Sequence, residues 1–165
     1  MVRNFFYLFL LLLVFTIGCS HIPDKGINNT WFAPELTQSE FGDDESHNAG
    51  KNCMSCHVKG GDREAAKEGI WSIAGTIYQT GTTKILAGST LELFTGPNGS
   101  GSKVISLPVD DKGNAYTNKE IYFGNGLFPV VTSPTGKKAF MMSSIGNGAC
   151  NSCHNNGTPK ITVEK

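Results

Sequence analysis

The sequence has no excess of charge of either sign, and it has few charged residues altogether. Its 165 residues include 14 Lys and Arg against 14 Asp and Glu, and charged residues make up only 17% of the chain. Nucleic-acid-binding domains carry a basic surplus, so this balance excludes nucleic acid as an expected partner. The chain also lacks Gly-x-Ser-x-Gly, a phosphate-binding loop and His-Glu-x-x-His. Common signals of hydrolases, nucleotide-binding proteins and zinc peptidases are therefore missing.

Long apolar runs are also missing, apart from one near the start that is too short to span a membrane. Residues 5–17 are apolar except for Thr16, whereas a transmembrane helix needs about 20 apolar residues. Arg3 precedes the run with a positive charge, so residues 1–18 are predicted to be a signal peptide. The protein is therefore expected to be exported.

The apolar run ends at Gly18-Cys19, which resembles the lipobox of bacterial lipoproteins. The resemblance implies cleavage before Cys19, lipidation of its thiol and anchoring of the chain to a membrane. Ser20 follows the cysteine, and by the same resemblance this favours the outer membrane, facing the periplasm or the cell surface. The alternative is an ordinary secretory signal that leaves Cys19 as a spare thiol.

Cysteines are few, and four of the five form two copies of one motif. Cys-x-x-Cys-His occurs at residues 53–57 and again at residues 150–154. This motif is the attachment signature of c-type haem, in which the two thiols form thioethers and the adjacent imidazole binds the iron. The sequence therefore predicts two haem c cofactors. The residues expected to bind them are the thiols Cys53, Cys56, Cys150 and Cys153 and the proximal imidazoles His57 and His154.

Few residues could act as the distal ligand of a haem iron, in addition to the proximal histidine, because the chain has only four His and four Met. Once those at the chain start and inside the motifs are set aside, the candidates are His47, Met141 and Met142. On a strand the two methionines would point to opposite faces, so only one of them could bind. The alternatives are a surface or capping role for His47 and core packing for the methionines. Which ligand would serve which haem stays open.

Helical periodicity is rare after the signal peptide. A short helix is expected at 62–68, with Asp62 as its N-cap and Gly69 as its end. From residue 70 onward apolar residues alternate between Gly-rich turns, which predicts a mainly β fold, an antiparallel β-sandwich with little helix. The expected strands are 70–78, 89–94, 103–109, 116, 121–123, 127–132 and 138–142.

Four runs within these strands carry a family resemblance: residues 74–78, 86–91, 111–116 and 126–131. Their turn glycines and alternating core positions resemble the carboxypeptidase-regulatory, prealbumin-like sandwich, over about Trp71 to Ser143. The resemblance implies a scaffold or binding module without catalytic residues of its own. It implies nothing about the chemistry of the flanking motifs.

These expectations divide the chain into five parts. They are a signal peptide (1–18), a lipidated N-terminus and flexible linker (19–46), a first haem c segment (47–69), a β-sandwich (70–143), and a second haem c segment with the C-terminal tail (144–165). The two motifs, although distant in sequence, are expected to meet in space at one end of the sandwich.

The expected function is electron transfer by an exported dihaem c-type cytochrome lipoprotein rather than catalysis. Its partners would be redox proteins or an extracellular acceptor, and self-assembly into longer haem chains stays open. Two alternatives remain. One is a haem enzyme such as a dihaem peroxidase, and the other is a haem-free module in which the four motif cysteines bind zinc or form disulfides.

Overall fold

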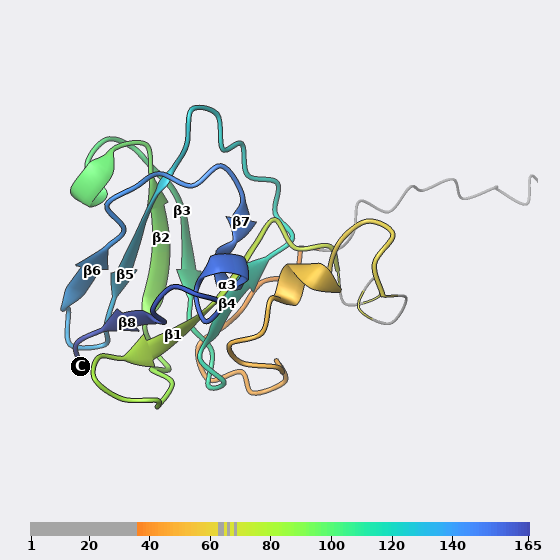
Figure 1. Cartoon of the computed structure of the whole chain (residues 1–165), viewed down its shortest axis with the longest axis horizontal. Helices are drawn as coiled ribbons and strands as arrows, with labels where there is room; N and C mark the ends of the chain where they lie inside the picture. The colour runs from red at the N-terminus through yellow and green to blue at the C-terminus, as the bar shows by residue number, and fades with distance from the viewer. Residues whose placement is uncertain (1–35, 63–64, 66, 68) are drawn as a thin grey trace, which may run out of the picture. The chain divides into compact units, whose positions relative to one another are not determined.

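Two facing β-sheets form the body of the protein in a computed structural model that describes residues 36–62, 65, 67 and 69–165 (Figure 1). Each sheet has four strands. The strands are β1 (Ile73–Gln79), β2 (Thr90–Phe94), β3 (Lys103–Pro108), β4 (Asn114–Thr117), β5 (Phe128–Thr132), β6 (Lys138–Phe140), β7 (Gly148–Ala149) and β8 (Ile161–Val163). Short helices lie at η1 (Cys53–Ser55), η2 (Pro97–Gly99) and α3 (Cys150–Cys153).

The first sheet is built around β1. Strand β4 pairs with β1 in antiparallel orientation, while β7 and β8 both pair with it in parallel. The second sheet has the order β3-β2-β5-β6, and all its pairs are antiparallel. The predicted mainly β sandwich with little helix is therefore confirmed, with two short parallel strands added to it.

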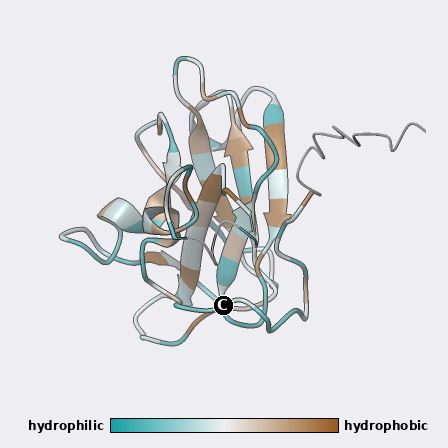
Figure 2. Ribbon diagram, turned by 90° about the vertical axis from the view of Figure 1, so that its right-hand side faces the viewer, coloured by the Kyte–Doolittle hydropathy of each residue, from teal (hydrophilic) through white to brown (hydrophobic). Residues whose placement is uncertain are grey.

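Alternation along the strands builds the core between the sheets. Ile73 and Ile77 of β1 are fully buried, and they pack in one cluster with Leu91, Leu93 and Leu107 from the second sheet. The strands carry most of the apolar colour in Figure 2, while the connecting loops are mainly polar. Odd-numbered residues of β1 thus face the core, and even-numbered residues face the other side of the sheet, where Ala74 and Thr76 are also buried. This rigid strand separates the two places where the motif segments dock.

One expected strand is not formed in the described structure, at residues 121–123. Ile121 and Phe123 do pack half-buried against the core, and Tyr122 between them is 87% exposed. Here the chain turns immediately, because Gly124 and Gly126 have φ values of +49° and +105° and Gly126 donates to the Phe123 carbonyl. The alternation of apolar residues at 121–123 therefore reflects the burial of two side chains and is not accompanied by strand pairing.

The expected helix before Gly69 is supported where it is described. Ala65 and Lys67 are helical. Asp62 accepts a hydrogen bond from the Ala65 backbone at 3.1 Å, as an N-cap residue does. Gly69 then leaves the helix with φ +126°.

The sandwich extends beyond residues 70–143 at both ends. Part of the expected linker docks on β4, where Ser39 is fully buried and donates its backbone N–H to the Tyr116 carbonyl at 3.0 Å. At the other end β7 and β8 complete the first sheet. Residues 1–18 and Cys19 lie outside the described residues. Within the described ranges, no helix is both long and apolar enough to cross a membrane.

Candidate functional site

The first motif holds its histidine rigidly inside the protein. His57 follows η1, is only 4% exposed, and its ring stacks on Trp71 with centroids 4.6 Å apart. Its Nδ1 lies 2.9 Å from the Gly69 carbonyl oxygen. A carbonyl can only accept, so Nδ1 donates its proton in this hydrogen bond. A backbone carbonyl at Nδ1 orients the ring in the way that metal-binding histidines are oriented when they bind through Nε2.

A second histidine stands opposite His57. The ring centroids of His47 and His57 are 6.1 Å apart, with their planes tilted by 34°. His47 and His57 are therefore the two imidazoles that would hold an iron in this part of the protein. Both rings line a cavity of about 750 Å³ together with Cys53 and Cys56. That volume lies in the range of cofactor sites.

The second motif repeats this arrangement on a different scaffold. Strand β7 leads directly into α3, which contains Cys150 and Cys153. His154 follows, and its Nδ1 lies 2.6 Å from the Pro159 carbonyl oxygen. Nδ1 again donates to a backbone carbonyl. Both motifs therefore orient their imidazole through Nδ1, as metal-binding histidines are oriented.

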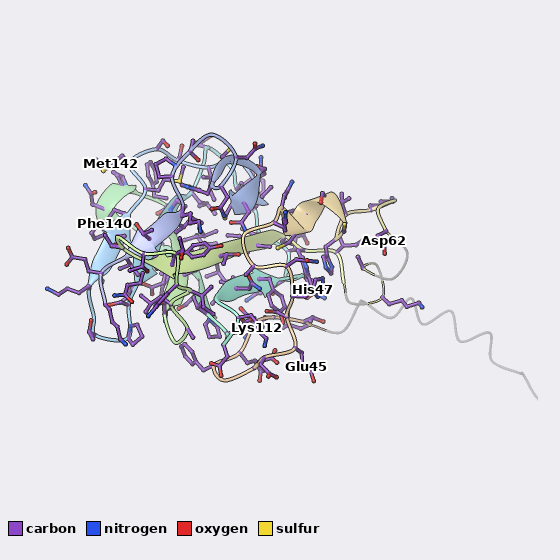
Figure 3. All side chains as sticks on the ribbon, turned by 60° about the horizontal axis from the view of Figure 1, so that its bottom comes forward. Glu45, His47, Asp62, Lys112, Phe140 and Met142 are labelled. Atoms are coloured by element: carbon purple, nitrogen blue, oxygen red, sulfur yellow. The ribbon has the colours of Figure 1, made fainter. Side chains whose placement is uncertain are left out.

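The second cavity, of about 570 Å³, is lined by all three motif residues and by both candidate methionines. Its walls come from the two sheets and are largely apolar. Besides the methionines, the apolar members are Leu91, Pro129, Val131, Ala139, Phe140, Ile145, Ala149 and Ile161. Figure 3 shows Met142 and Phe140 on one side of the molecule and His47 and Asp62 on the other. The structure thus brings His47 to the first motif and Met141 and Met142 to the second.

Burial perturbs two of the motif thiols. It raises the pKa of Cys150 to about 12 and also raises the pKa of Cys53, and the charges of neighbouring thiolates add to both effects. All four motif cysteines are free thiols in the structure. The buried surroundings therefore favour a neutral sulfur over a thiolate.

A buried polar network joins the two motif segments across β1. Asn151, inside the second motif, is 3% exposed and donates to the Lys51 carbonyl and to Thr76 Oγ1, both at 2.9 Å. Thr76 Oγ1 donates to Asn114 Oδ1 at 2.7 Å and accepts from Gly50 N at 2.8 Å. The two motif segments therefore adjoin along β1 at Thr76, and their expected place at one end of the sandwich stays a prediction.

Removing the hydroxyl of Thr76 should weaken this junction. Thr76→Val keeps the shape of the side chain but leaves the Gly50 and Asn151 donors and the Asn114 acceptor without their partner. We expect a loss of about 3 kcal/mol in the free energy of unfolding, because each orphaned buried group costs about 1–3 kcal/mol. Urea denaturation of the full chain measures it. Thr76→Ser retains the oxygen and should lose less than half as much; equal losses would contradict the network's role.

The thiols do not gather into one metal site. Cys53 and Cys56 line the first cavity, and Cys150 and Cys153 line the second. Across the ranges that the structure describes, no group of three or more His, Cys, Asp and Glu is arranged to hold a metal ion. A zinc site formed by all four cysteines would require such a group.

Several residues that shape the two sites were not singled out from the sequence. Trp71 was read as a strand residue, yet it stacks on His57 and lies 4.8 Å from the Tyr116 ring. Asn151 occupies one of the x positions of Cys-x-x-Cys-His, so the motif alone does not predict a role for it. The orienting carbonyls of Gly69 and Pro159 carry no side-chain signal at all.

No family model matches the chain, and no curated protein or solved structure matches it. The resemblances to a carboxypeptidase-regulatory sandwich and to a dihaem cytochrome lipoprotein therefore stay predictions. The arguments for function depend on the geometry of the two cavities.

Proposed function

We propose that the protein is an electron carrier that holds two haem c groups, one in each cavity. The observation that supports this most directly is the repeated histidine geometry: His57 and His154 each donate Nδ1–H to a backbone carbonyl beside two thiols. Haem supplies reversible one-electron chemistry when it is bound. The chain's own residues attach it, orient its ligands and limit access of water.

Attachment is an addition without a leaving group. Each motif thiol forms a sulfur–carbon bond to one carbon of a vinyl group, and the thiol proton goes to the other carbon, so nothing is oxidised or reduced. Cys53 and Cys150 would form the more buried of the four thioethers, and Cys56 and Cys153 the more exposed. Trp71 and the Gly69 carbonyl hold the His57 ring in place, which keeps the ligand preorganised in both oxidation states.

The cavities favour a carrier over a haem enzyme such as a dihaem peroxidase. An enzyme needs an open position on the iron and acid–base groups beside it. Here each cavity already contains a second side chain of the kind that binds haem iron, His47 in one and two methionines in the other.

The test is the full chain, expressed with a haem c attachment system and purified. We expect an intact mass increased by two haems and, after reduction, the sharp α-band typical of c-type cytochromes. A colourless protein with unmodified thiols would overturn the proposal. Rapid turnover of peroxide by the reduced protein would favour the peroxidase alternative instead.

We further propose that the protein is exported and anchored to the outer membrane by a lipid on Cys19, where it exchanges electrons with redox proteins or an extracellular acceptor. Several acyl chains on one residue give stable anchoring. Cys19→Ser should therefore move the protein from the membrane fraction to the soluble fraction and leave its haem absorbance unchanged. Fractionation with haem staining measures this, and a variant that stays in the membrane fraction would contradict the anchor.

A further inference from the structure

We propose that the two haem sites are unequal, with His47 as the second ligand beside His57 and Met141 as the second ligand beside His154. This inference rests on the proposed function and deepens it, because it assigns one ligand pair to each site. It would make the protein a carrier with two different potentials.

His47 lies in the first site, and hydrogen bonds hold its backbone there. Its ring faces that of His57 at 6.1 Å. The backbone beneath it is fixed to β4, since Asn114 donates its amide to the Ser46 hydroxyl at 2.9 Å and to the His47 carbonyl at 3.3 Å. The imidazole is therefore carried on an anchored segment and not on a free loop.

Strand alternation selects Met141 over Met142 in the second site. The Met141 N–H donates to the Pro129 carbonyl at 3.1 Å, which continues the pairing of β6 with β5 beyond Phe140. Met141 therefore shares a face with Ala139, which packs against the core, whereas Met142 lies on the opposite face and is 78% exposed. Both line the cavity, but only Met141 is directed inward by the strand.

The two sites differ in the charges that border them as well as in their second ligands. The first cavity is bordered by the charged side chains of Glu45, Lys51 and Asp62, whereas the second is bordered by one, that of Lys160, beside core residues. Methionine ligation raises the potential of a haem relative to ligation by two histidines. The site of His154 is therefore expected to be reduced first.

The experiment is a spectroelectrochemical titration of the haem-loaded full chain and of single variants. The wild type should show two waves of equal amplitude and fully low-spin haem. His47→Ala should turn half of the haem high-spin and shift only the lower wave. Met141→Ala should turn the other half high-spin and shift only the upper wave. Met142→Ala discriminates between the methionines and should move neither wave.

Conservative exchanges keep the test decisive if an alanine variant folds poorly. His47→Met should restore low-spin haem and raise the lower wave, and Met141→His should restore it and lower the upper wave. Unchanged low-spin spectra in both alanine variants, or an upper wave that responds to Met142→Ala in place of Met141→Ala, would overturn the assignment. The haem count by mass is read separately, so two haems with the wrong ligands refute this inference alone, and no haem refutes the proposed function.

Discussion

Replacing Cys53 and Cys56 together by alanine should remove one covalent haem and leave the other in place. The matched pair Cys150→Ala with Cys153→Ala should do the same at the other site. The two thiol pairs line different cavities, so each haem is attached without help from the other pair. Intact-mass measurement should find one haem on each double variant and two on the wild type.

The spectra of the two double variants should differ, because each keeps a different site. Ser55→Ala and Ser152→Ala are suitable controls, since they change a motif position but keep both thiols, and both should retain two haems. Loss of both haems from either double variant would show that the sites are not independent. Two haems on either double variant would contradict attachment through these thiols.

Local sequence was enough to predict the class of fold. In β2, Leu91 and Leu93 are buried while Glu92 between them is partly exposed, and this pattern can be read without knowing the partner strands. The Gly-rich turns between strands were visible in the same way. What local pattern could not show was pairing, because β7 and β8 have only two and three residues.

Which candidate second ligand lies beside which motif could not be predicted, for a related reason. Spacing identified the thiols and imidazoles of each motif, since they lie within five residues of one another. His47 reaches the first site because its segment is bonded to Asn114, which is 67 residues away. Met141 reaches the second because β6 pairs with β5. Such contacts depend on tertiary structure and leave no short-range signal.

Only a residue without a side chain fits where the second motif joins the first sheet. Gly148 pairs with Ile73 in the parallel register of β7 on β1. A Cβ at Gly148 would overlap the Ser72 carbonyl oxygen and the Ile73 Cα. Since both are backbone atoms, they cannot rotate away, and the strand itself would have to move. Because β7 leads straight into α3, Cys150 would move with it.

Gly148→Ala should therefore lower the free energy of unfolding by about 3 kcal/mol, at the upper end of the usual cost of overpacking. It should also reduce attachment of the second haem while the first remains. Gly146→Ala is the matched control, because a Cβ there meets nothing within 4 Å, and the smaller entropy of its unfolded chain should leave it as stable as the wild type or up to about 1 kcal/mol more stable. Urea denaturation and intact mass measure both effects. If the two alanine variants have the same free energy of unfolding, β7 can move away from β1 at no cost in stability. The second motif would then have to be held in place by contacts other than those of β7.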